Sequence, residues 1–258
     1  MLNRIAQGEG PPLVVAHGLF GSARNWGAVA KRLSDIRRVV AVDMRNHGAS
    51  PWSDQHSYEA LAEDLAEVID AEGGRADLLG HSMGGKAAMA LALAAPERVA
   101  SLVVADIAPR AYGHSQAPMI EAMRSVDLGA VERRSDADAQ LRERVEDPAV
   151  RAFLLQSLDA PDRRWRLNLD ALDAEMDRLV GWPDPGGRYD GPALFLRGEA
   201  SDYVSDADEP EIRRLFPRAR IETIAGAGHW LHAEAPRPFE AALRAFLSGS
   251  GLTSPEAP

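Results

Sequence analysis

A serine set between glycines is the first feature of the sequence that could do chemistry. Ser82 lies in the stretch Gly80-His81-Ser82-Met83-Gly84, which matches the pattern G-x-S-x-G. An apolar run precedes the motif and an alanine-rich run follows it, so we expect a strand to enter the turn and a helix to leave it. Such a turn forces unfavourable dihedrals on the serine, and the flanking glycines provide the necessary room. We therefore interpret Ser82 as a nucleophile.

A serine hydroxyl needs a general base, which is usually a histidine. His229 lies just after the last predicted strand, and a nucleophile followed by a histidine near the C-terminus is a known order of the serine triad. The pair His229-x-x-His232 has no evident third ligand, so we predict no metal site. His81 is expected to shape the serine turn, whereas His56 and His114 are expected at the surface or in a lid.

The stretch 17–21 (HGLFG) follows the first strong strand, where a loop can supply a backbone N–H to an oxyanion. The first donor should be the N–H of Met83, the residue after the nucleophile. The second is assigned to Leu19, with Phe20 as the alternative. Around these groups we expect a substrate pocket that includes Phe20, His81 and Trp230.

These residues require a scaffold of alternating strands and helices. Near-continuous apolar runs predict strands buried on both faces at 12–17, 37–44, 76–81, 101–107, 192–198 and 220–226. The last run alternates more than the others, as expected near a sheet edge. Helices are predicted from Ser57 to a glycine pair, from Ser82 to near Pro96, and close to the C-terminus. The pattern predicts an α/β fold with a mostly parallel sheet and helices on both faces.

One segment breaks this alternation. Residues 112–189 show no strand pattern and contain about four helical stretches, inserted at the carboxyl end of a strand, where open α/β sheets bind ligands. We interpret 111–189 as a helical cap, or lid, on a core formed by 1–110 and 190–248, and 249–258 as a disordered tail. Six apolar residues of the cap could line the pocket, although core packing is the commoner role: Met119, Met123, Phe153, Leu154, Trp165 and Trp182.

Composition restricts the classes of function. The chain of 258 residues has a formal net charge of −10, which disfavours nucleic-acid binding. It has no cysteine, so disulfides and thiolate catalysis are excluded, and no apolar run is long enough for a membrane span. Without an apolar signal core at the N-terminus, we expect a cytoplasmic protein.

Several motifs together carry a family resemblance. The stretches HGLFGS, VDMRNHGAS, GHSMGGKAAM, DIAP and IAGAGHWLHAE resemble the YbfF-type esterases of the α/β-hydrolase superfamily, over about residues 13–245. The resemblance implies a serine esterase or thioesterase that has a helical cap and needs no cofactor. In the second stretch, Arg45, Asn46 and His47 are expected to fix a loop by hydrogen bonds, in preference to touching substrate.

The acid that orients the histidine has two candidates. In many α/β-hydrolases it is the third residue after a glycine that ends the penultimate strand, but here that residue is Ser201. Asp202 follows one position later, and such a shift can turn a side chain away. Some members of the superfamily place the acid at the position of Asp106, at the end of the strand after the serine helix. We favour Asp106, with Asp202 as the alternative and Glu199 and Asp206 as remote options.

The predicted function is hydrolysis of carboxylic esters with short-to-medium acyl chains, through an acyl-enzyme. Two alternatives share the fold: an acyl-CoA thioesterase and a cofactor-free lyase or C–C hydrolase. For a thioesterase, Arg110, Arg124 or Arg133 could meet a phosphate, although surface arginines are usually only solvated. A ligand-binding protein that turns over slowly is the non-enzymatic alternative. The expected partner is a small ester or thioester.

Overall fold

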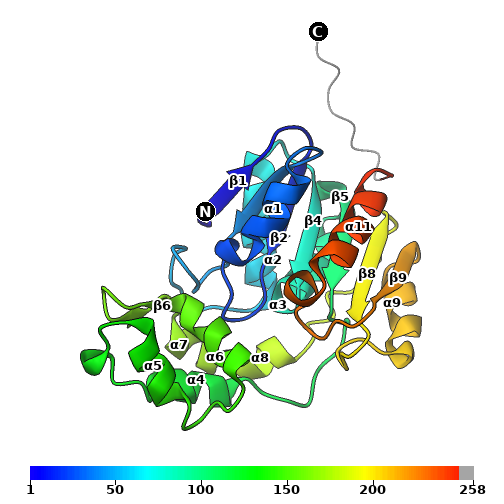
Figure 1. Ribbon diagram of the computed structural model, residues 1–258. Coiled ribbons are helices and arrows are strands. Elements are labelled where there is room, and N and C mark those ends of the chain that lie inside the picture. The colour runs from blue at the N-terminus through cyan, green and yellow to red at the C-terminus, as the bar shows by residue number, and fades with distance from the viewer. Residues whose placement is uncertain (250–258) are drawn as a thin grey trace.

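A computed structural model describes residues 1–249 of the chain and contains a seven-stranded sheet (Figure 1). The strand order is β1-β3-β2-β4-β5-β8-β9. The edge strand β1 runs antiparallel to β3, and all other pairings are parallel. The bounds are β1 Arg4–Gln7, β2 Pro12–Ala16, β3 Arg38–Val42, β4 Ala76–His81, β5 Val99–Ala105, β8 Ala193–Gly198 and β9 Ala219–Ile224. The tail predicted at 249–258 lies outside the described residues, apart from Gly249.

The predicted mostly parallel sheet is confirmed, and each of the six predicted strands is present within about two residues. β9 lies at the sheet edge, as its alternating pattern indicated. β1 was not predicted, because its four residues are mostly exposed and carry no apolar run.

Helices cover both faces of the sheet, as predicted. One core layer packs α1 (Gly27–Leu33) and α11 (Pro236–Leu247) against strand residues that include Val15 and Leu79. The opposite layer packs α2 (Tyr58–Ala71), α3 (Met83–Ala94) and α9 (Glu209–Leu215) against their neighbours Val14 and Leu78. Adjacent strand residues therefore point to opposite layers, which is why these strands read as continuous apolar runs.

α2, the helix that follows β3, begins directly after Ser57, the capping residue predicted from the sequence. The Ser57 side chain accepts a hydrogen bond from the Ala60 N–H, and α2 ends before the glycine pair at 73–74. The remaining short helices of the core are η1 Ala23–Trp26, η2 Pro96–Arg98, η5 Asp206–Asp208 and α10 Leu231–Glu234.

Between β5 and β8 the chain leaves the sheet. The insertion contains α4 (Ala117–Arg124), η3 (Leu128–Ala130), α5 (Arg134–Leu141), α6 (Pro148–Leu154), η4 (Leu155–Ser157), β6 (Leu158–Asp159), β7 (Arg164–Trp165), α7 (Leu169–Ala174) and α8 (Met176–Val180). Figure 1 shows these green elements gathered beyond the end toward which β8 points. The β6–β7 pair is a correction to the strand-free prediction, since two-residue strands leave no period in a sequence. No helix within residues 1–249 is long and apolar enough to cross a membrane.

Candidate active site

Ser82 lies on a strained turn between β4 and α3. Its backbone angles are φ 52° and ψ −119°, which a residue with a side chain rarely adopts. The two flanking glycines are sterically required. A Cβ atom on Gly80 would lie 2.2 Å from the Gly84 carbonyl oxygen, and a Cβ on Gly84 would lie 2.5 Å from the Ala16 carbonyl oxygen. The predicted strand–turn–helix geometry of the motif is therefore present.

His229 is held by a buried carboxylate. Its Nδ1 lies 2.8 Å from Oδ2 of Asp106, a fully buried residue just beyond β5. Oδ1 of the same carboxylate accepts the Gly198 N–H at 2.9 Å, and the Ser201 hydroxyl donates to Oδ2. With the Nδ1 proton directed at Asp106, the Nε2 lone pair of His229 is available as a base.

The other acids considered from the sequence do not reach His229. Asp202 is exposed, and its carboxylate forms no hydrogen bond or ion pair within residues 1–249. Glu199 accepts the Gly226 N–H, and Asp206 pairs with Arg197. Ser201, the third residue after Gly198, donates to the carboxylate of Asp106.

Two rings contact the His229 imidazole, and a third, His232, packs against one of them. Tyr203 stacks on it with the ring centroids 3.9 Å apart. His81 Nε2 lies 2.8 Å from the His229 carbonyl oxygen, and burial holds the pKa of His81 well below its usual range, so His81 donates there as a neutral ring. His232 stacks on Trp26 at 4.4 Å, and burial lowers the pKa of His232 to about 4. These contacts fix the backbone and the ring plane of His229.

Two backbone N–H groups lie beside the serine without a partner. Neither the Leu19 nor the Met83 N–H makes a hydrogen bond within the described part of the chain. The loop lies against the turn, since a Cβ on Gly18 would come 3.2 Å from the Ser82 Cβ. The alternative donor is not available, because the Phe20 N–H donates to His47 Nε2 at 3.2 Å.

A cavity of about 470 Å³ opens over these groups. Ser82, His229 and the three predicted pocket residues, Phe20, His81 and Trp230, line it together with apolar side chains of the insertion. Of the six apolar residues considered from the sequence, Met119, Phe153 and Leu154 line the cavity. The other three do not: Met123 and Trp165 are buried in the core and joined by a hydrogen bond, and Trp182 packs against the core.

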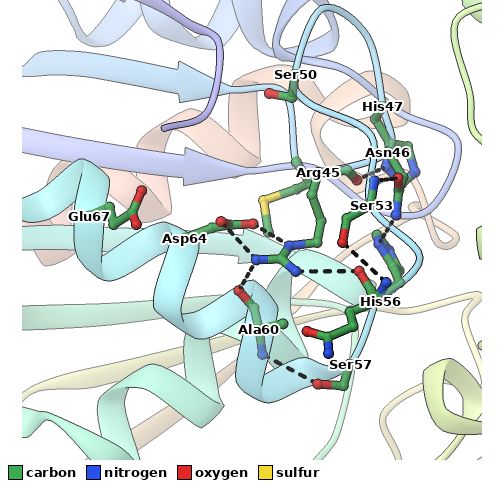
Figure 2. A network of polar contacts seen from close by, with 12 residues as sticks. Arg45, Asn46, His47, Ser50, Ser53, His56, Ser57, Ala60, Asp64 and Glu67 are labelled. Carbon is green, nitrogen blue, oxygen red and sulfur yellow. Dashed lines mark hydrogen bonds and ion pairs between the residues drawn. The ribbon is translucent and has the colours of Figure 1, made fainter.

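The loop after β3 is fixed by its own polar side chains, as expected. Figure 2 shows the Arg45 guanidinium reaching the Asp64 carboxylate, 2.6 Å away, and the Ala60 carbonyl oxygen. Asn46 contacts the His56 ring, 3.2 Å away. The prediction that His56 lies at the surface or in a lid is wrong: it is fully buried between Asn46 and the Met83 sulfur, and burial lowers its pKa to about 3. Its position follows from the fold of this loop, which no local pattern revealed.

Two residues of the site were not anticipated. One is Tyr203, described above. The other is Lys86, which is buried in the wall of the cavity and donates to the carbonyl oxygens of Val180 and Gly181 at the end of α8. Burial, together with the charge of Arg110, lowers the pKa of Lys86 to about 7. A lysine in an alanine-rich helix usually indicates a solvent-facing side, so no signal in the sequence pointed to the burial of Lys86.

Comparison with known proteins agrees with the fold and the motifs. Residues 11–236 match the model of the alpha/beta hydrolase fold family. This chain is an α/β-hydrolase. It is 40% identical to esterase YbfF of Escherichia coli K12, over 94% of this chain and 95% of that protein. It is 43% identical to the mouse sn-1-specific diacylglycerol lipase ABHD11, over 92% of this chain and 81% of that protein.

A solved structure is similar to this chain in three dimensions. This α/β-hydrolase superposes on a marine microorganism esterase with a TM-score of 0.91 and 40% sequence identity, covering 95% of this chain and 98% of the other. The resemblance to YbfF-type esterases that the motifs indicated is confirmed by the family match and by the 40% identity to esterase YbfF over 94% of this chain.

Proposed function

We propose that this α/β-hydrolase cleaves carboxylic esters through an acyl-enzyme formed on Ser82. Relatives named esterase or lipase at 40–43% identity support ester hydrolysis as the activity. The observation that carries the assignment of residues is the 2.8 Å contact between His229 Nδ1 and the buried Asp106 carboxylate, in the cavity that Ser82 lines.

In the proposed mechanism, His229 Nε2 takes the Ser82 proton as the hydroxyl oxygen attacks the ester carbonyl carbon. The Leu19 and Met83 N–H groups stabilise the oxyanion, and one such donor typically contributes a factor of about 10²–10³ in kcat. His229 then protonates the departing alcohol. Water, deprotonated by His229, attacks the acyl-enzyme and releases the carboxylic acid and Ser82.

The insertion is proposed to act as a lid that carries the acyl-binding wall. Its apolar residues Met119, Val150, Phe153, Leu154, Met176 and Leu179 line the cavity. The cavity of about 470 Å³ has room for a short or medium acyl chain, and we propose such chains as the substrates.

The arginines considered for a CoA phosphate all have acidic partners. Arg110 pairs with Asp208, and Arg133 with Asp136. Arg124 pairs with Asp170 and Asp173. These contacts favour an oxygen ester over an acyl-CoA thioester.

The proposed location of the protein is the cytoplasm, which cell fractionation tests.

The test is hydrolysis of p-nitrophenyl esters from acetyl to palmitoyl by wild type and Ser82→Ala. We expect a rate that peaks at short-to-medium chains and falls at least about 10⁴-fold in the variant. Equal rates in the two proteins would exclude Ser82 as the nucleophile. A maximum at palmitoyl would leave the nucleophile in place and overturn the proposed chain length.

A further inference from the structure

The loop that carries Leu19 is held by hydrogen bonds to three successive peptide groups. In the first, the Gly18 carbonyl oxygen lies 2.7 Å from His17 Nδ1 and accepts the Gly21 N–H at 3.0 Å. The N–H and C=O of a trans peptide point in opposite directions. The Leu19 N–H, which belongs to the same peptide as the Gly18 carbonyl, therefore points away from His17 and Gly21.

The next two peptides, Leu19–Phe20 and Phe20–Gly21, are held from the core and from the insertion. The Phe20 N–H donates to His47 Nε2 at 3.2 Å, and the Phe20 carbonyl oxygen accepts the Ser157 hydroxyl at 2.8 Å. Phe20 has a φ of 64°, a left-handed conformation that a bulky residue keeps only when its surroundings hold it there. These two hydrogen bonds are what hold it.

His47 is a buried ring whose Nε2 can accept the Phe20 N–H. It is fully buried, and its Nδ1 donates to the Arg45 carbonyl oxygen at 2.8 Å, which leaves Nε2 with a lone pair toward Phe20. Burial, with smaller effects from His17 and His56, holds the pKa of His47 well below its usual range. The His17 and His47 rings meet edge to face, with centroids 4.9 Å apart, so the two supports form one unit.

We infer that His47 is a positioning residue for the oxyanion hole: its acceptor fixes the peptide between Leu19 and Phe20, and so the direction of the Leu19 N–H of the adjoining peptide. This inference rests on the proposed function. It gives the histidine of the stretch VDMRNHGAS a part in the reaction, beyond fixing its own loop. Without the acceptor, the buried Phe20 N–H loses its partner, Phe20 leaves the left-handed conformation, and the Leu19 N–H turns with it.

The experiment compares two substitutions of the same ring. His47→Phe keeps an aromatic ring but removes both nitrogens, whereas His47→Gln places a carbonyl oxygen near the position of Nε2. Losing one oxyanion donor entirely costs about 10²–10³ in kcat, so we expect His47→Phe to lower kcat by about 10–100-fold. KM should stay within about threefold, and His47→Gln should recover kcat to within about fivefold of wild type.

A second readout separates positioning from a merely structural role. A trifluoromethyl ketone that carries the preferred acyl chain forms a tetrahedral adduct with the serine, and its oxyanion needs the same donors. Its inhibition constant should rise in His47→Phe by about the factor lost in kcat. Asp64→Asn is the matched control. It removes an ion pair of the same loop without touching the segment 17–21, so kcat and inhibitor affinity should remain at wild-type values.

Two results would overturn the inference. One is a His47→Phe variant that unfolds at a lower temperature but keeps its kcat and its affinity for the ketone. The other is an equal loss of kcat in His47→Phe, His47→Gln and Asp64→Asn. Hydrolysis that survives in Ser82→Ala, assayed alongside, would instead refute the proposed function, so the two failures are distinguishable.

Discussion

Replacing Asp106 by asparagine is the substitution that tests the assignment of the acid most directly. The carboxylate receives the His229 ring at Oδ2, the Gly198 N–H at Oδ1 and the Ser201 hydroxyl. An asparagine has only one acceptor oxygen, and the Gly198 N–H requires it at the Oδ1 position. The amide nitrogen of the variant must then face His229.

The consequence for His229 follows from the direction of its proton. Facing an amide N–H, Nδ1 becomes an acceptor, and the ring proton moves to Nε2, the nitrogen that has to accept the Ser82 proton. Loss of the correct tautomer in a serine triad costs about 10⁴ in kcat. We expect a fall of about 10³–10⁴, which corresponds to about 4–5.5 kcal/mol of transition-state stabilisation. KM should change little, because substrate does not touch the buried carboxylate.

The assay measures kcat and KM on the best p-nitrophenyl ester, with Asp202→Asn as the control. Asn tolerates the left-handed conformation at position 106, where φ is 52°, so the variant should fold, and circular dichroism and thermal unfolding check this. Asp202→Asn should stay within about twofold of wild type, because that carboxylate is exposed and unpaired within residues 1–249. Near-normal kcat in Asp106→Asn, with a loss of several orders of magnitude in Asp202→Asn, would refute the reasoning.

Two further predictions concern buried groups near the site. Because the pKa of His232 is about 4 in the folded state and about 6.5 when unfolded, the unfolded state binds a proton first as pH falls. Its contribution to stability is thus present above pH 6.5 and is lost toward pH 4. Between pH 7 and 5 the free energy of unfolding should fall by about 1–2 kcal/mol more in wild type than in His232→Leu, measured by urea unfolding; equal falls would contradict this. Lys86→Met should speed hydrogen exchange in α8, because it removes the donor to the carbonyl oxygens of Val180 and Gly181. Exchange in β4 should stay unchanged. Unaltered protection of α8 would show that these contacts do not hold the helix.

The sheet was predictable because burial on both faces leaves a strong signal. The runs around Val14, Leu78 and Val103 are mostly apolar, and their parallel order follows from the helical stretches between them. Ser82 and His229 could be singled out as candidates for a related reason, since each lies shortly after a strand that the pattern identifies. The insertion was recognised as helical, but its short β6–β7 pair left no period to detect.

Contacts between segments that are distant along the chain could not be predicted from the sequence. Tyr203 and His229 lie 26 positions apart, and the stacking of their rings depends on the paths of the loops after β8 and β9. His56 was expected at the surface or in the lid because no motif around it supported another role, yet the polar side chains near it satisfy one another and leave the ring buried. The choice between Asp106 and Asp202 as the acid also depended on contacts between distant segments, since local spacing alone left both residues as candidates.

The contacts between the insertion and the core limit which sequence changes can alter the substrate preference of this enzyme without loss of turnover. Ser157 holds the Phe20 carbonyl, Asn168 donates to Asn46, and Lys86 holds the end of α8. A transplanted insertion from a relative would bring new pocket walls but would lose these partners unless they were transplanted too. Chimeras that exchange the segment between β5 and β8 should therefore lose turnover along with the old substrate preference, whereas point substitutions of cavity-facing side chains change the preference alone. Directed evolution of this scaffold should begin with those side chains.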